Sequence, residues 1–340
     1  MSSQAAPTTL SASVYAADGA DVNTQVQRII EDLPNINEKL QNARPEEILA
    51  WSMNNLPNLY QTTAFGLTGC VTLDLVSRIS TELAQSKGVP AQHLVPLIFI
   101  DTLYHFPQTT ELAKRSSEHY NAPMHVYTPV GSATVSEFEE RWGPQLWERD
   151  EDTYDYLVKV EPARRAYDEL KVCAVFTGRR RSQGADRAAL PAVEVDETGL
   201  IKVNPLLNWS FEDVNKYVKE HAVPYNELLD LGYKSIGDWH STALPSDKNA
   251  GERSGRWADK AGKTECGLHK DYFKFKVLAE KKMREAELSQ TKIIENGIIH
   301  MQLKSFKGPV RIQTHMSENK AEIAKTLELF PESKSSLSAV

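Results

Sequence analysis

Residues 59–70 read LYQTTAFGLTGC, a run of aromatic and β-branched residues that passes into small residues and glycines. The first half of this run is typical of a strand, and the glycines of the second half predict a turn. The next stretch, residues 71–88, has apolar residues at helical spacing and ends in a glycine, where helices commonly stop. A strand that turns through small residues into a helix is the repeating unit of parallel α/β sheets.

The same unit recurs along the chain. Residues 193–205 predict a hairpin that turns at Thr198-Gly199, and Ser210 with Asp213 predicts a capped helix start. This alternation favours right-handed crossovers and an α/β fold, with a mostly parallel sheet covered by helices on both faces. Further strands are predicted at 94–100, 123–129 and 171–178, and further helices at 45–56, 106–121, 133–143, 154–170 and 210–221.

The composition favours a cytoplasmic globular enzyme. The 340 residues are 41% hydrophobic and 25% charged, and the net charge of −7 argues against a nucleic-acid-binding surface. The longest apolar run, residues 94–100, is too short to span a membrane. Residues 1–27 contain no Lys or Arg, which argues against a signal or transit peptide. The three cysteines show no paired spacing, so we expect reduced thiols, with Cys70 and Cys173 buried in apolar surroundings.

We expect three parts, whose boundaries are implied by the family resemblance described below. Residues 1–44 are predicted to be an N-terminal extension, disordered over its first 20 residues, which are rich in Ser, Ala and Thr. Residues 45–285 form the predicted catalytic domain, and its loop at 232–267 has no periodicity, as functional or disordered loops often do. Residues 286–340 are a C-terminal extension, with a predicted hairpin at Asn296-Gly297 and then a loose tail.

The turn at residues 62–69, TTAFGLTG, is a candidate anion-binding loop. The first backbone N–H groups of the following helix are unpaired and lie at the positive end of its dipole. Thr62, Thr63 and Thr68 supply hydroxyls, and Gly66 permits close approach of a ligand. The stretch matches neither the P-loop pattern nor GxGxxG, so an ordinary tight turn is the alternative.

Two other segments also follow predicted strands. Asp101 and Thr102 come directly after 94–100, and ligands of open α/β sheets lie beyond the carboxyl ends of strands. A turn capped by Asp101 is the alternative. Residues 177–187, TGRRRSQGADR, place four arginines within nine residues. Guanidinium groups suit phosphate and sulfate, whereas a solvated charged face is the ordinary interpretation of such a run.

Cys266 is the one cysteine in a polar stretch, KTECGLHKDYFKFKVLAEKK. Lys263 lies three residues before it and His269 three residues after it. Cationic neighbours lower the pKa of a thiol, and the thiolate is the nucleophile, so Cys266 is the reactive candidate. Half of a zinc site at Cys266 and His269 is the alternative, but the sequence offers no second pair of ligands.

In this order, the segments resemble the phosphoadenylyl sulfate (PAPS) reductase family in its fungal, thioredoxin-dependent form. The matching motifs lie within residues 45–282 and are TTAFGLTG, FIDTLYHFPQT, KVEPARRA, FTGRRRSQG, NPLLNW, GYKSIGDWHST, GERSGRW and KTECGLH. The resemblance implies a Rossmann-like fold of the adenine-nucleotide α-hydrolase type, in which residues 62–69 form a modified pyrophosphatase loop.

The resemblance also implies the roles of individual residues. Asp101 and Thr102 would lie near the adenine, and the arginine-rich segments would hold the 3′-phosphate and the sulfonyl group. The implied catalytic residues are Cys266, Lys263 and His269. The implied substrate-binding residues are Thr62, Thr63, Phe65, Gly66, Thr68, Asp101, Thr102, Arg179, Arg180, Ser182, Gln183, His240, Arg253, Arg256 and Trp257.

The implied chemistry is the reduction of 3′-phosphoadenylyl sulfate to sulfite and adenosine 3′,5′-bisphosphate, in the assimilation of sulfate into cysteine and methionine. The Cys266 thiolate would become an S-sulfocysteine, and reduced thioredoxin would release sulfite because no second cysteine lies nearby. The resemblance further implies a homodimer without a bound metal, cofactor or iron–sulfur cluster. The extension after residue 285 contains no cysteine, so we expect no fused thioredoxin-like domain.

Three alternatives remain open at the level of sequence. An adenylyl sulfate reductase would need four thiolates for its [4Fe–4S] cluster, and the chain has three cysteines in all. An ATP-dependent adenylyl- or amidotransferase would need an SGGxDS loop, from which AFGLTG departs. A non-catalytic nucleotide sensor on the same fold would be favoured by loss of the nucleophile or the arginines, and both are present.

Overall fold

The computed structural model describes residues 21–90, 92–184, 187–245, 247, 251–256, 276–277 and 281. The chain divides into two compact units, Met1–Lys282 and Met283–Val340, and every described residue lies in the first. Four predicted site residues lie outside the described residues, as do the hairpin and tail predicted after residue 285. These site residues are Trp257, Lys263, Cys266 and His269.

A six-stranded sheet forms the centre of the described unit. Its strand order is β3-β2-β1-β4-β6-β5, and every neighbouring pair is parallel except β5 with β6. All four residues of β2 are buried, which is typical of a parallel strand covered on both faces. The strands are β1 (Leu59–Thr63), β2 (Leu97–Ile100), β3 (Met124–Tyr127), β4 (Ala174–Phe176), β5 (Val193–Val195) and β6 (Ile201–Val203).

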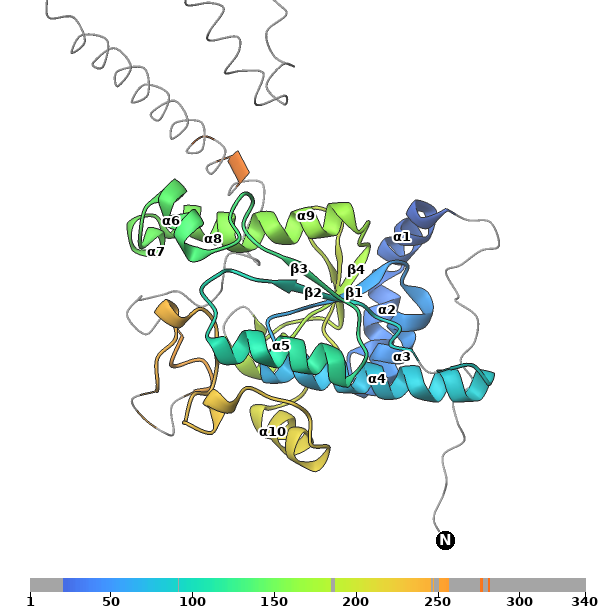
Figure 1. The fold of residues 1–340 in the computed structure, drawn as a ribbon. Helices are drawn as coiled ribbons and strands as arrows, with labels where there is room; N and C mark the ends of the chain where they lie inside the picture. The colour runs from blue at the N-terminus through green and yellow to red at the C-terminus, as the bar shows by residue number, and fades with distance from the viewer. Residues whose placement is uncertain are drawn as a thin grey trace, which may run out of the picture. The chain divides into compact units, whose positions relative to one another are not determined.

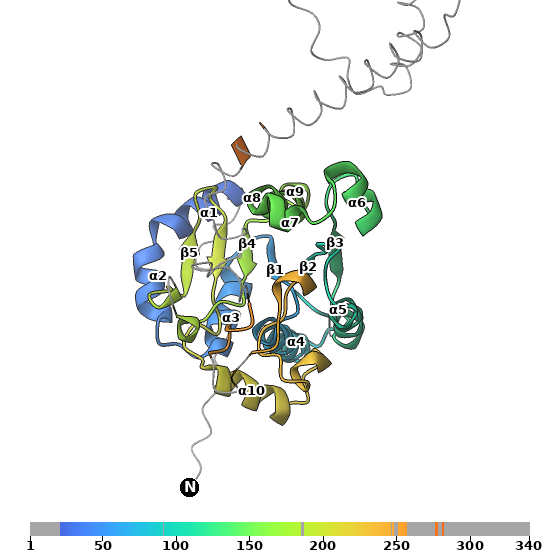
Figure 2. The same ribbon diagram turned by 90° about the vertical axis from the view of Figure 1, so that its left-hand side faces the viewer.

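Helices cover both faces of this sheet. Figures 1 and 2 show α9 on one face and α4, α5 and α10 on the other. The mostly parallel α/β fold predicted from the sequence is therefore confirmed. The helices are α1 (Val22–Glu31), α2 (Leu33–Leu40), α3 (Pro45–Asn55), α4 (Leu67–Lys87), α5 (Pro107–His119), α6 (Val135–Trp142), α7 (Leu146–Arg149), α8 (Glu151–Asp155), α9 (Glu161–Glu169) and α10 (Phe211–Glu220).

Local signals set several helix ends as predicted. Gly88 ends α4 in a left-handed conformation with φ of 65°, and the Ser210 hydroxyl accepts from the Asp213 N–H at the start of α10. Two boundaries differ from expectation. Helix α4 begins at Leu67 rather than after Cys70. The predicted helix 154–170 is broken by a π-helical turn, η1 (Tyr156–Val160), between α8 and α9.

The N-terminal helices belong to the main core. Ile29, Ile36 and Leu40 are buried in the same hydrophobic cluster as β1 and α4. The Asn37 amide donates to the Val193 carbonyl at 2.8 Å and accepts from the Val193 N–H at 2.9 Å, so it covers the edge strand β5. The core therefore shows no break at residue 45, where the sequence suggested the domain would begin.

Strands β1 and β4 mark the point where the order of the sheet reverses. From β1 the chain proceeds to β2 and β3 on one side, and β4 lies on the other side of β1. The loops that follow two such strands separate and leave a crevice at their carboxyl ends. Within the described residues, no helix is both long and apolar enough to cross a membrane.

Candidate functional site

A cavity of about 210 Å³ lies in this crevice, after the carboxyl ends of β1 and β4. Six segments contribute to its wall. Its described lining residues are Thr62, Thr63, Ala64, Phe65, Gly66, Leu67, Thr68, Gly69, Thr109, Gly178, Arg179, Gln183, Arg187, Phe211, Asn226, Leu229, Lys234, Ser235, Ile236, Glu252 and Arg253. Eight of the predicted substrate-binding residues are thus brought together: Thr62, Thr63, Phe65, Gly66, Thr68, Arg179, Gln183 and Arg253.

The turn from β1 into α4 presents the start of a helix to the cavity. Gly66 is the N-cap of α4 and has no side chain to cap it, so the first N–H groups of the helix have no intrahelical partner. The neighbouring Phe65 adopts φ of 54°, a left-handed conformation that is strained for a residue with a β-carbon. The Thr63 hydroxyl accepts from the Phe65 N–H at 2.9 Å, and the Phe65 ring packs edge-on against Phe99. The hydrogen bond and the ring packing therefore hold Phe65 in this conformation.

Gly69 allows this turn to lie close to the strand. A Cβ at residue 69 would lie 2.6 Å from Oγ1 of Thr63. That is the same hydroxyl that holds Phe65, so a larger residue would disturb the turn itself. By contrast, a Cβ at Gly66 would have no atom within 4 Å, because this position faces the open cavity.

Arg180 lies behind the cavity wall and has no exposed surface. Its Nε donates to Oγ1 of Thr68 at 3.0 Å, and its Nη1 donates to Ser182 at 2.9 Å and to the Trp209 carbonyl at 3.2 Å. Its Nη2 donates to both carboxylate oxygens of Glu252, at 2.6 and 2.5 Å. In this state Arg180 and Ser182 are bound to the protein rather than aimed at a ligand.

The other arginines of the segment differ from Arg180 in position. Arg179 lines the cavity and pairs with Glu194 on β5, and Arg187 lines it and donates to Oε1 of Gln183. Arg181 bonds the Leu190 carbonyl and Asn208, away from the cavity. The three consecutive arginines therefore have three different surroundings.

The cavity is strongly cationic. Its described lining includes Arg179, Arg187, Lys234 and Arg253, and only one carboxylate among the described lining residues, that of Glu252. Together with the N-terminus of α4, these groups suit an anion with several oxygens, such as a phosphate or sulfonate.

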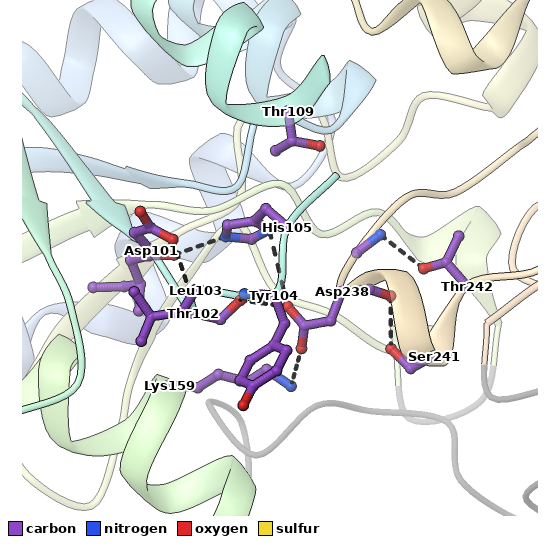
Figure 3. Close-up of polar contacts among 12 residues, drawn as sticks. Asp101, Thr102, Leu103, Tyr104, His105, Thr109, Lys159, Asp238, Ser241 and Thr242 are labelled. Carbon is purple, nitrogen blue, oxygen red and sulfur yellow. Dashed lines mark hydrogen bonds and ion pairs between the residues drawn. The ribbon is translucent and has the colours of Figure 1, made fainter. Parts of the chain in front are cut away.

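A second polar cluster, centred on Asp238, lies beside the cavity (Figure 3). The Thr102 hydroxyl donates to Asp238 at 2.6 Å, and Nζ of Lys159 lies 2.9 Å from Asp238 and 2.7 Å from Asp155. Burial opposes ionisation of the Asp238 carboxyl, but the ammonium of Lys159 and the hydrogen bond from Thr102 outweigh it. The pKa of Asp238 therefore lies well below its usual range.

This cluster fixes the segment that follows residue 236. The Trp239 N–H donates to the Tyr104 carbonyl at 2.9 Å, and His240 stacks on Trp147 with ring centroids 4.2 Å apart. Nε2 of His240 also lies 2.9 Å from the Tyr154 hydroxyl. The cluster thereby anchors the chain that runs on from Lys234, Ser235 and Ile236 in the cavity wall.

Three predicted ligand residues belong to this cluster or its surroundings instead of the cavity. Thr102 and His240 make the contacts just described. The Asp101 carboxylate accepts from the Leu103 N–H at 2.9 Å, which closes a turn in which Leu103 is left-handed with φ of 69°. The capped turn considered as the alternative for Asp101 is thus present.

The segment 251–256 returns alongside residues 242–243. The Ala243 N–H donates to the Gly255 carbonyl at 2.8 Å, and Thr242 and Arg256 form an isolated bridge. A Cβ at Gly255 would overlap the Ala243 carbonyl oxygen, and one at Gly237 would overlap the Arg256 guanidinium. Arg256 therefore packs against Gly237, outside the cavity lining, while Glu252 and Arg253 enter it.

The two described cysteines are poor nucleophiles. Cys70 is buried, and burial raises the pKa of its thiol to about 12. Cys173 is only partly buried, contrary to the expectation of a fully buried residue, and burial raises the pKa of its thiol as well. Both thiols are therefore protonated near neutral pH.

Several residues of the site were not identified as ligands from the sequence. Lys234 and Glu252 lie within quoted motifs but were not selected, and Arg187 was noted only as part of the arginine run. Lys159 and Asp238 carried a usable signal, since a lysine inside the apolar run YLVKV must find a partner. Over the part of the chain that the structure describes, no group of three or more His, Cys, Asp or Glu side chains could hold a metal ion.

Comparison with known proteins gives consistent matches. Residues 58–244 match the family model described as phosphoadenosine phosphosulfate reductase domain. A phosphoadenosine phosphosulfate reductase of Emericella nidulans is 51% identical over 259 residues, which are 75% of this chain and 81% of the relative. One of Saccharomyces cerevisiae is 51% identical over 245 residues, 70% of this chain and 90% of the relative. A crystal structure of phosphoadenylyl-sulfate reductase from Candida auris, in a phosphate complex, matches with a TM-score of 0.55 and 52% identity, covering 63% of this chain and 97% of that chain.

Proposed function

The chain belongs to the phosphoadenosine phosphosulfate reductase family, and we propose that it reduces 3′-phosphoadenylyl sulfate to sulfite and adenosine 3′,5′-bisphosphate at the cavity beyond the carboxyl ends of β1 and β4. The observation that carries this assignment is the cationic lining of the cavity beside the N-terminus of α4. The substrate has a 3′-phosphate, a 5′-phosphate and a sulfonyl group, all of which need fixed positive charge.

The substrate occupies the cavity with its anionic groups toward these charges. The N–H groups at Gly66–Thr68 and the guanidinium of Arg179 donate hydrogen bonds to phosphate oxygens, and Arg253 adds a further positive charge to the lining. The Candida auris relative was solved as a phosphate complex, which supports an oxyanion ligand for this chain. Fixed cations also stabilise the charge that develops on the leaving phosphate during reaction.

Cys266 is the nucleophile in this proposal. The high pKa values of the other two thiols support it by exclusion, because neither supplies thiolate at neutral pH. Chain length permits it as well. Cys266 is the tenth residue after Arg256, and a chain of ten extended residues spans at most about 35 Å. Lys263 and His269 are its nearest cationic neighbours in sequence, and cationic neighbours favour the thiolate form of a cysteine.

The reaction then balances in two steps. The Cys266 thiolate attacks the sulfur of the substrate, an S–S bond forms, the S–O bond to phosphate breaks, and adenosine 3′,5′-bisphosphate leaves with the electron pair. A thiolate of reduced thioredoxin next attacks Sγ of Cys266, and sulfite leaves with two electrons. The second thiol of thioredoxin resolves the mixed disulfide and restores the Cys266 thiol.

A single-turnover experiment tests this sequence. Without reductant, the enzyme should release one equivalent of adenosine 3′,5′-bisphosphate and carry a sulfonate on the peptide TECGLH, detected by mass spectrometry. Reduced thioredoxin should then liberate sulfite. Cys266→Ser should abolish both steps yet bind adenosine 3′,5′-bisphosphate normally, whereas Cys173→Ser should turn over like the wild type. A sulfonate on Cys70 or Cys173, or turnover by Cys266→Ser, would overturn the mechanism.

The choice of substrate and donor needs its own measurement. The rates with 3′-phosphoadenylyl sulfate and with adenylyl sulfate, which lacks the 3′-phosphate, should be compared. An adenylyl sulfate reductase would prefer adenylyl sulfate. The proposal has four further parts. The electron donor is reduced thioredoxin, the protein holds no iron–sulfur cluster, it forms a homodimer, and it is located in the cytoplasm. Iron analysis and light scattering of the pure protein test the cluster and the dimer.

A further inference from the structure

Glu252 lines the cavity and binds the buried guanidinium of Arg180. It is the one carboxylate among the described residues that line the cationic cavity. Both of its oxygens accept from Nη2 of Arg180, and Oε1 also accepts from the Gln183 amide at 3.3 Å. The two oxygens of this carboxylate thus accept from one guanidinium and one amide, as two oxygens of a bound phosphate would.

Arg180 has no other donor to offer an anion. Its remaining N–H groups are bound to Thr68, Ser182 and the Trp209 carbonyl, and its guanidinium is fully buried. Because a buried charge must be compensated, the carboxylate of Glu252 stabilises Arg180 while the site is without substrate. A phosphate or sulfonate can reach this arginine only along the side that Glu252 now covers.

An incoming oxyanion and the Glu252 carboxylate repel one another. At a separation of about 5 Å in a partly buried site, this repulsion alone lowers affinity on the order of a hundredfold. The cavity of about 210 Å³ is also smaller than the ~300–1,000 Å³ typical of small-molecule sites. Both observations indicate that Glu252 does not keep its place when the substrate binds.

The backbone around Glu252 allows it to leave. The segment is anchored at its far end, where the Gly255 carbonyl accepts from the Ala243 N–H. Near Glu252 it forms turns, in which Ser254 bonds Gly251 and Arg256 bonds Arg253. A Cβ at Gly251 would have no atom within 4 Å, so the chain beside Glu252 has open space.

We propose that Glu252 is the resident counter-ion of Arg180 and that an oxyanion of the substrate replaces it there. Substrate binding then exchanges one ion pair for another and turns Gly251–Arg253 as it does so. This inference rests on the proposed function, since it takes the cavity to be the site for the phosphates and the sulfonyl group.

Glu252→Gln tests the exchange because glutamine keeps the size of the side chain and removes its charge. We expect calorimetry to show inorganic phosphate and adenosine 3′,5′-bisphosphate binding at least tenfold more tightly than to the wild type. Glu220→Gln, on the exposed surface of α10, is the matched control and should bind both ligands as the wild type does. Without ligand the Tm of Glu252→Gln should fall, and phosphate should raise it by more than in the wild type, since phosphate restores the missing partner of Arg180.

If Glu252→Gln does not fold, Glu252→Asp serves instead. The shorter side chain of aspartate reaches Arg180 less well, so this variant protein should also bind phosphate more tightly than the wild type. Unchanged or weaker phosphate binding in these variants, beside normal binding in the wild type, would show that Glu252 stays on Arg180 and would overturn the inference alone. Failure of the wild type to bind either ligand would instead overturn the proposed function, and the exchange with it.

Discussion

A substitution at Gly66 can test ligand binding at the start of α4 with little effect on stability. We consider the substitution Gly66→Ala. Its backbone, with φ of −67° and ψ of 159°, is one that alanine adopts without strain. A methyl group there would have no protein atom within 4 Å. The free energy of unfolding should therefore fall by only about 1 kcal/mol, which is the cost of replacing a glycine N-cap by alanine, a poorer N-cap.

The same methyl group should interfere with the ligand. It would project into the cavity at the start of α4, where an oxyanion approaches the first N–H groups of the helix. Loss of one charge-assisted hydrogen bond costs about 1.5–3 kcal/mol, which weakens binding by roughly 10- to 150-fold. Calorimetry with adenosine 3′,5′-bisphosphate measures this loss, and urea denaturation measures stability.

Gly69→Ala is the matched control with the opposite expectation. Its Cβ would lie 2.6 Å from Oγ1 of Thr63, so the variant should lose on the order of 1–3 kcal/mol of stability. Wild-type affinity in a stable Gly66→Ala protein would refute the reasoning, because the ligand would then not approach this turn. A large loss of stability in Gly66→Ala would refute the claim that the position faces open space.

Two further substitutions test the buried charges. Asp238→Asn should lower the free energy of unfolding by about 3 kcal/mol or more, because Lys159 loses one of its two buried carboxylates. Urea denaturation measures this loss, with Asp101→Asn as the control. A loss below about 1 kcal/mol would contradict the prediction. Burial lowers the pKa of His93 to about 4, so the folded state keeps this imidazole neutral while the unfolded state protonates near pH 6.5. Its contribution is therefore complete above pH 6.5 and is lost as pH falls toward 4. Wild type should lose about 2 kcal/mol more stability between pH 7 and pH 4.5 than His93→Leu, and equal losses would contradict this.

The elements that the sequence predicts well are those set by neighbouring residues. Ser210 with Asp213, Gly88 and the apolar run of β2 act over one to four residues, and the structure bears out each of them. The turn at 62–69 and its place at the carboxyl end of β1 were also predictable from the change of a strand pattern into a helical one, whereas its role in binding an anion stays a prediction.

The arrangement of the arginines could not be predicted in this way. Arg179 lines the cavity and Arg180 is wholly buried, although they are adjacent in the chain. Successive side chains of an extended segment point to opposite sides, but the sequence does not say which side faces the ligand. The pairing of Lys159 with Asp238 was equally hidden, since it joins residues 79 positions apart through the packing of η1 against the segment after Ile236.

The pairing of β1 with β4 also bears on how the protein folds. Leu59 lies opposite Ala174 in the sheet, so the two walls of the cavity are joined only after a long loop of chain has closed. Closing such loops is slow, and contacts of this kind form late. A chain in which β4 is not yet paired with β1 would lack the arginine wall of the cavity and have little affinity for nucleotide. Nucleotide should therefore slow unfolding without speeding refolding, so that it prolongs the lifetime of the finished enzyme rather than guiding its formation.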